Sequence, residues 1–159
     1  MHEQLLALSI SRRMLGAAIF KSNRLEHIEV RSVLADERRA VQTSEAFISW
    51  LVQMFEVKSA AIETPDTRNG DRRDILYKSV IAELRRHSVP IWEVSPTEML
   101  QSFAEPPLGR RDQVRKIAAS FWPVLKGGAT AEAKLDAAAV GIYVQLRRLL
   151  QASINKQSK

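Results

Sequence analysis

The sequence contains no cysteine, no long hydrophobic run and only three histidines in 159 residues. The absence of cysteine excludes disulfides and any metal site built on thiolates. The three histidines share no spacing that is typical of metal ligands, so they do not indicate a histidine-based metal site. No apolar run approaches the roughly 20 residues of a membrane-spanning helix, and the first residues lack the pattern of a secretory leader. We therefore expect a cytoplasmic protein with no membrane partner.

The composition is typical of a globular domain with a surplus of basic residues. Hydrophobic residues make up 45% and charged residues 26% of the chain. The length predicts a single domain over residues 1–153, followed by a disordered basic tail at 154–159. Lys and Arg total 24 against 18 Asp and Glu, which gives a net charge of +6. This surplus favours a polyanionic partner such as nucleic acid, although many domains with other functions carry as much.

The order of apolar runs and turn signals predicts an α/β fold with a mixed sheet. Three short apolar runs at 5–10, 14–20 and 24–33, separated by turns, predict three antiparallel strands. After them helices and strands alternate, and the expected elements are a helix at 44–55, a strand at 58–63, a helix at 75–86, a strand at 89–94 and three more helices, near 96–103, 114–125 and 130–149. The strand-helix-strand crossovers favour parallel pairing of the later strands.

Glu63 is the most informative acid in the chain, because it ends the apolar run at 58–63 and stands just before Thr64 and Pro65. An ionised carboxylate in a protein interior costs several kcal/mol unless it is paired, hydrogen-bonded or bound to metal. A surface or paired acid is the simpler interpretation, and a metal ligand is the functional one. Asp136, beside the apolar stripe of the last helix, is on its own interpreted as a solvated acid.

Four segments carry a resemblance to a known family: LALSISRRMLG at 6–16, AAIE at 60–63, RRDQV at 110–114 and KLDAAAVGI at 134–142. The order of elements resembles the ribonuclease H-like fold, a three-layer α/β arrangement with a mixed five-stranded sheet flanked by helices. Within that fold the chain resembles the RuvC-type Holliday junction resolvases over nearly its whole length.

The resemblance implies cleavage of DNA by two Mg²⁺ or Mn²⁺ ions about 4 Å apart, held by four carboxylates. Glu63 and Asp136 fall on two of these catalytic positions. The first-strand acid falls on Ser9, and the acid one turn before Asp136 falls on Ala133. Because a serine hydroxyl does not carry the charge of the carboxylate that bridges the metals, we expect metal binding to be weak or lost.

Two nearby acids are candidate substitutes for the missing metal ligands. Glu132 shares a helix face with Asp136, and Asp66 follows Glu63 in the next loop. The simpler interpretations are an acid that stabilises a helix N-terminus for Glu132 and a solvated loop acid for Asp66. If no metal binds, we expect a nearby arginine, or protonation of one acid, to relieve the repulsion between Glu63 and Asp136.

Arginines near the expected cleft are candidates for contact with DNA phosphates, and solvated helix faces are the alternative. The candidates are Arg12, Arg13, Arg68, Arg72, Arg73, Arg110, Arg111 and Arg115. The resemblance also implies a homodimer that presents two clefts to one branched DNA. Three functions stay open: DNA binding with cleavage weak or lost, an active Mg²⁺- or Mn²⁺-dependent endonuclease that uses Glu63, Asp136 and the substitute acids, and a non-catalytic dimerisation or interaction module.

Overall fold

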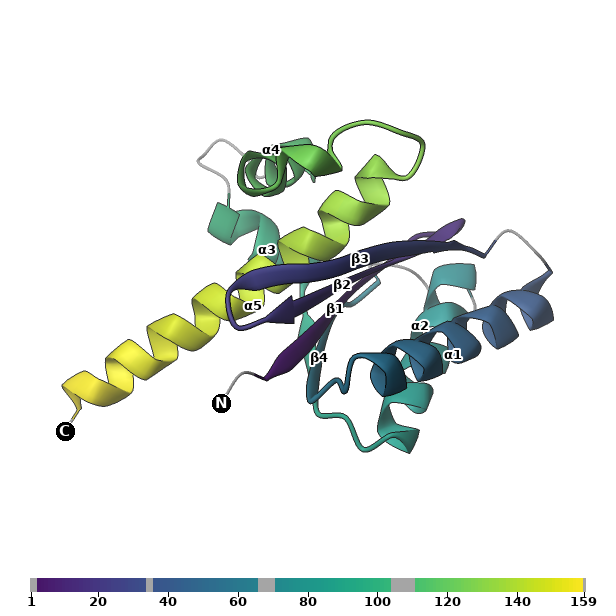
Figure 1. Cartoon of the computed structure of the whole chain (residues 1–159), viewed down its shortest axis with the longest axis horizontal. Coiled ribbons are helices and arrows are strands. Elements are labelled where there is room, and N and C mark those ends of the chain that lie inside the picture. Colours follow the sequence, from purple (N-terminus) through teal and green to yellow (C-terminus); the bar gives the residue numbers. More distant parts are fainter. Residues whose placement is uncertain (1–2, 34–35, 66–70, 104–110, 159) are drawn as a thin grey trace.

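The computed structural model describes residues 3–33, 36–65, 71–103 and 111–158. Within these ranges a five-stranded sheet is covered by helices on both faces, as Figure 1 shows. The elements in chain order are β1 (Gln4–Ile10), β2 (Met14–Lys21), β3 (Arg24–Ser32), α1 (Glu37–Met54), β4 (Ser59–Glu63), α2 (Arg72–Arg86), β5 (Ile91–Val94), α3 (Pro96–Phe103), α4 (Arg111–Phe121), the 3₁₀ turn η1 (Pro123–Leu125) and α5 (Ala131–Gln157).

The sheet has the strand order β3-β2-β1-β4-β5. β1 pairs antiparallel with β2, and β2 with β3, whereas β1–β4 and β4–β5 are parallel pairs. This confirms the predicted mixed sheet and the ribonuclease H-like arrangement. Because β1 and β4 are parallel neighbours, Ser9 and Glu63 come to the same edge of the sheet, each one residue beyond the paired Leu8 and Ile62.

The sheet separates two apolar cores. On one face, side chains such as Leu6, Leu8 and Ile62 pack with buried residues of α1 and α2. On the other face, Leu5 and Ala7 pack with α5. The central strand β1 is buried from Leu5 to Ile10 because helices cover both of its faces, as expected for the parallel part of a sheet.

Helix α5 approaches the sheet closely at two glycines. A Cβ on Gly16 of β2 would lie 2.5 Å from the carbonyl oxygen of Ala133. On the helix itself, a Cβ on Gly141 would lie 2.6 and 2.8 Å from two ring carbons of the fully buried Phe20. Real Cβ atoms essentially never come within 3.0 Å of such atoms. The two glycines therefore fix the distance between α5 and the sheet, and with it the position of Asp136.

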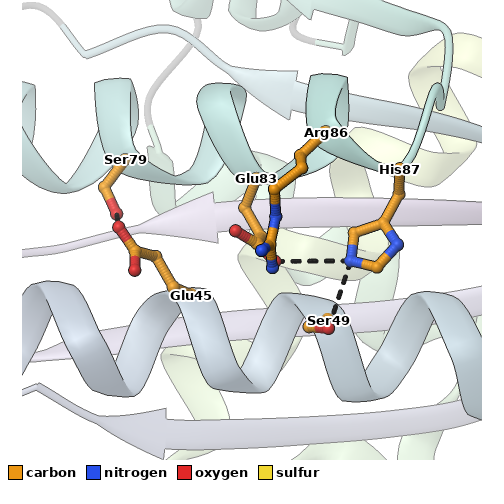
Figure 2. A network of polar contacts seen from close by, with 6 residues as sticks. All are labelled: Glu45, Ser49, Ser79, Glu83, Arg86 and His87. Carbon is orange, nitrogen blue, oxygen red and sulfur yellow. Dashed lines mark hydrogen bonds and ion pairs between the residues drawn. The ribbon is translucent and has the colours of Figure 1, made fainter.

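Polar contacts join α1 to α2 on the opposite face (Figure 2). His87 Nε2 lies 3.1 Å from Ser49 Oγ and 3.3 Å from Glu83 Oε1. Arg86 donates to the same Glu83 carboxylate, whose side chain is only 7% exposed. His87 thus has a structural role at the end of α2.

The helix boundaries differ from the sequence-based predictions in several places. α1 begins at Glu37 and not near residue 44, because Asp36 accepts a hydrogen bond from the Arg39 backbone N–H and caps the helix. α4 ends at Phe121, and the 3₁₀ turn η1 follows where the helix was expected to continue to residue 125. α2 begins at Arg72, inside the polar run expected to be a loop, because Asp71 accepts a hydrogen bond from the Arg73 backbone N–H and caps the helix. α5 continues to Gln157, through part of the segment expected to be a disordered tail. No glycine or proline interrupts residues 142–157, so the helix propagates. None of the helices in the described ranges is long and apolar enough to cross a bilayer.

Candidate nucleic-acid interface

A cleft of about 440 Å³ opens at the edge of the sheet where β1 ends. It is bounded by the β1–β2 turn, the first turn of α2, α4 and the beginning of α5. Its lining residues are Ser9, Ser11, Arg12, Arg13, Met14, Arg73, Arg115, Ala129, Glu132, Ala133 and Asp136. The cleft therefore combines three of the four positions expected to carry acids with four of the eight candidate arginines.

Ser9 lies at the inner end of this cleft. Its register partner is Gly16, and only 9% of Ser9 is exposed. The missing Cβ of Gly16 allows the Ala133 carbonyl to lie directly over β2. Two positions where the resemblance expects carboxylates, Ser9 and Ala133, therefore lie side by side around Gly16 and carry no charge.

Asp136 forms a two-pronged ion pair with Arg115 of α4. Arg115 Nε donates to Asp136 Oδ1 at 2.9 Å, and Arg115 Nη2 donates to Oδ2 at 3.0 Å. The Asp136 side chain is 13% exposed and that of Arg115 is 26% exposed. In this geometry both carboxylate oxygens face a guanidinium, which is the strongest common form of ion pair between side chains. The expectation that an arginine neutralises one of the acids is therefore met at Asp136.

Glu132, the first substitute acid, belongs to the same group. Its Oε1 lies 3.5 Å from Arg115 Nη1, and its side chain is 79% exposed. A contact this long and this exposed stabilises the fold little. Asp66, the second substitute, lies outside the described residues.

Glu63 lies in a neighbouring cavity of about 290 Å³ and not in the lining of the main cleft. Glu63 is 8% exposed at the end of β4, and the cavity is also lined by Thr64, Pro65 and Leu100. Arg73 is the residue shared by the two linings. A basic side chain thus borders both the cavity of Glu63 and the cleft of Asp136.

The other candidate arginines have different places. Arg12 donates to Asp71 Oδ2 at 3.0 Å while 69% of its side chain stays exposed, and Arg13 beside it is exposed as well. Arg72 donates to the Val33 carbonyl and does not line the cleft. Arg68, Arg110 and the side chain of Arg111 lie outside the described residues.

The N-cap of α2 links this basic turn to the helix. The Arg73 backbone N–H donates to Asp71 Oδ1 at 2.9 Å, and this bond is the largest cause of the lowered pKa of Asp71. The positive charge of Arg12 lowers the pKa further. Asp71 is therefore ionised at neutral pH, and it holds the β1–β2 turn against the start of α2.

The residues of the cleft do not fit a pair of divalent metal ions. Mg²⁺ and Mn²⁺ need several oxygen ligands, most of them charged, and the first-strand position offers only the Ser9 hydroxyl. Ala133 offers no side-chain oxygen, and the Asp136 carboxylate already faces a guanidinium. Over the described ranges, no three His, Asp or Glu residues lie close enough together to hold a metal ion.

Sequence reasoning placed Arg115 among the phosphate contacts but did not predict its pairing with Asp136. The two residues are 21 positions apart on different helices, so no local spacing reveals the pair. Ser11 was also missed. Its Oγ accepts from the Met14 backbone N–H at 3.0 Å, which shapes the turn that presents Arg12 and Arg13.

Comparison with known proteins agrees with this description at the level of the fold. Neither a protein-family model nor a curated protein sequence matches the chain. Among solved structures, RuvC from Thermus thermophilus in complex with a Holliday junction substrate aligns with a TM-score of 0.72 and 14% identity, over 92% of this chain and 96% of that chain. The yeast mitochondrial Holliday junction resolvase aligns with a TM-score of 0.63 and 12% identity, over 87% of this chain and 76% of that chain.

A third structure, the fowlpox virus Holliday junction resolvase, aligns with a TM-score of 0.60 and 9% identity, over 91% of this chain and 99% of that chain. The chain thus has a ribonuclease H-like fold, which is similar to that of RuvC and other Holliday junction resolvases. At these identities the likeness establishes the fold.

Proposed function

We propose that this protein binds branched DNA through the phosphate backbone at the cleft, as a homodimer, and does not cleave it by two-metal chemistry. The observation that carries the proposal is the charge of the lining. Four arginines and two acids line the cleft, which gives a formal charge of +2, and one of the acids is held by Arg115.

The fold supports DNA as the partner, since a RuvC protein of the same fold was solved in complex with a Holliday junction substrate. Exposed arginines at the mouth of the cleft suit phosphate, because the guanidinium fork matches phosphate oxygens and stays charged at any physiological pH. Arg12 and Arg13 occupy such positions on the β1–β2 turn.

The lining argues against the nuclease alternative. Two divalent ions add a charge of +4, and carboxylates must balance most of it for the ions to stay bound. A lining that is already positive repels the ions. The neutral Ser9 and Ala133 stand where balancing charges are needed, so the same substitutions that favour phosphate disfavour metal.

A fluorescence-anisotropy titration with a labelled four-way junction and a linear duplex tests the binding. We expect tighter binding to the junction and a steep loss of affinity between roughly 50 and 200 mM salt. Arg13→Ala should weaken binding and reduce the salt slope by about one unit. Its matched control is Arg24→Ala, at the β2–β3 turn on the opposite end of the sheet, which should have little effect. Absence of binding at low salt would refute the proposal.

Incubation of the junction with Mg²⁺ or Mn²⁺ tests the second part of the proposal. We expect no cleavage products. Cleavage that disappears in Glu63→Gln would show the active endonuclease instead. Light scattering on the free protein tests the homodimer, and a strict monomer at micromolar concentration would contradict that part.

A further inference from the structure

Asp136 is one of the positions where the sequence resemblance implies a metal ligand, and in this structure its carboxylate is paired with Arg115. This pair determines what the cleft can bind around Asp136. From its geometry we infer that the pair is a latched phosphate site, in which Asp136 occupies the guanidinium of Arg115 until DNA binds. A phosphodiester of the bound DNA then displaces Asp136 and accepts the hydrogen bonds of Arg115. The arginine thereby supplies the positive charge that a metal ion would otherwise supply. This inference rests on the proposed function and deepens it.

The ion pair between Arg115 and Asp136 has the geometry of a site for a two-oxygen anion. Arg115 presents Nε and Nη2 in parallel to the two oxygens of Asp136, at 2.9 and 3.0 Å. A phosphate presents two oxygens in the same way and accepts the same pair of hydrogen bonds. The site is therefore already shaped for a two-oxygen anion, and Asp136 is the anion that fills it in the free protein.

The Arg115–Asp136 pair is accessible from the cleft. A quarter of the Arg115 side chain is exposed, and it borders the same cleft as the exposed turn that carries Arg12 and Arg13. A phosphate that enters past this turn reaches Arg115 without any rearrangement of the sheet. Two hydroxyls, those of Ser9 and Ser11, also line the path.

Arg73 is a second basic group that lines the cleft. Its side chain is half-buried, and it borders the same space as Arg115. The charges of both guanidinium groups therefore attract an anion that enters the cleft.

The latched phosphate site and a metal site predict opposite changes in junction affinity when Asp136 is substituted. Asp136 competes with phosphate for Arg115, so Asp136→Asn should strengthen binding to the junction, by about fivefold at low salt. Arg115→Gln should weaken binding by about tenfold, and Arg115→Lys should weaken it by less, because lysine keeps the charge and loses the two-pronged geometry. Junction binding should persist in EDTA, since the site needs no divalent ion.

The decisive measurement is the double variant. If Asp136 acts by holding Arg115, Asp136→Asn gives no gain in the Arg115→Gln background. Glu3→Gln is the matched control: it removes the same charge from an exposed site at the far end of β1, and it should change the affinity less than twofold. The inference would be overturned if Asp136→Asn raised the junction affinity no more than Glu3→Gln, or raised it equally without Arg115. Weaker binding by Asp136→Asn, or binding that requires Mg²⁺, would also overturn it.

Inorganic pyrophosphate separates this inference from the proposed function, because it carries paired phosphate oxygens and no DNA structure. Its stabilisation of the protein, measured as a shift in Tm for each folded variant, should be larger in Asp136→Asn than in the unmodified protein and absent in Arg115→Gln. Pyrophosphate stabilisation without junction binding would refute the DNA proposal and retain the phosphate site. If the protein binds the junction, and if neither Asp136→Asn nor Arg115→Gln changes this binding or the Tm shift with pyrophosphate, the phosphate site is refuted and the DNA proposal is retained.

Discussion

The contact between Gly141 of α5 and Phe20 of β2 can be used to test what sets the packing distance between α5, which carries Asp136, and the sheet. In Gly141→Ala the new Cβ would meet the Phe20 ring, with two of the ring carbons at 2.6 and 2.8 Å. Phe20 is fully buried, and its ring packs edge-on against Trp122 with centroids 5.6 Å apart. The ring therefore has no room to move away, and α5 or the ring has to shift.

The expected magnitude combines two opposing effects. Overpacking of a well-packed core costs about 1–3 kcal/mol, and three close ring contacts place this case near the upper end. Alanine is favoured over glycine inside a helix by about 1 kcal/mol. The net loss of unfolding free energy should be about 2 kcal/mol, equivalent to a fall in Tm of about 4–8 °C for a domain of this size.

Phe20→Leu provides the internal control, because leucine lacks Cε2 and Cζ, the two ring carbons that the new Cβ would approach most closely. In that background Gly141→Ala should be neutral, or stabilising by up to about 1 kcal/mol through helix propensity alone. Urea unfolding of the four proteins gives the coupling energy directly. An equal loss of stability from Gly141→Ala in both backgrounds would show that the helix is not seated by this contact.

Four further predictions follow from other contacts. Gly16→Ala should lower the unfolding free energy by about 1–2 kcal/mol, because the Cβ would meet a backbone oxygen of Ala133 that no side-chain change can relieve; a thermal melt checks this. Glu83→Gln should cost about 1–2 kcal/mol through its contacts with Arg86 and His87, whereas Glu45→Gln, which loses one 3.4 Å contact, should cost less than about 0.5 kcal/mol. The pKa of Asp71 is lowered in the folded protein, so its ionised form stabilises the fold at pH values above its ordinary pKa. This contribution is lost as the pH falls through the lowered pKa. The difference in Tm between the unmodified protein and Asp71→Ala should therefore vanish in acid. Leu149→Gln, at a side chain that is 60% exposed, should leave the unfolding free energy within about 0.5 kcal/mol of the unmodified value.

Most of the fold was predictable because its elements are short and strongly patterned. The three opening strands and the strand that ends at Glu63 are bounded by turn residues, and the structure confirms their antiparallel and parallel pairing. The start of α2 was missed because a run of charged residues resembles a loop, although Asp71 is a standard helix cap.

The far end of α5 shows a second limit of sequence patterns. Leu146 and Leu149 continue the helical spacing of buried Leu135 and Ile142, yet they are 48% and 60% exposed. Spacing tells which residues share a helix face, but it does not tell whether another element covers that face. Here Leu135 and Ile142 pack with α4 residues such as Val114 and Ala118, whereas the C-terminal half of α5 extends past the other elements, as Figure 1 shows.

The sequence predicted individual residues of the candidate site, but it did not predict which of them contact one another. The positions of Ser9 and Asp136 on one cleft agree with the expected arrangement, whereas Glu63 lines the adjoining cavity. The pairing of Arg115 with Asp136 depends on how α4 packs against α5, which is a tertiary contact between two helices joined by η1. Local sequence carries no signal for such a contact.

The neutral residues and the ion pair form one consistent set of charges. If Ser9 and Ala133 were carboxylates, four acids would crowd the end of the sheet, and a single guanidinium would not balance them. With both positions neutral, one arginine is enough to neutralise Asp136, which at 13% exposure is too buried to stand alone without cost. The positive charge that metal ions would bring is thereby supplied by α4 itself. For this reason a change at Asp136 should move the affinity for phosphate and the affinity for metal in opposite directions. A variant with carboxylates at positions 9 and 133 would also need to lose Arg115 before it could hold a metal pair.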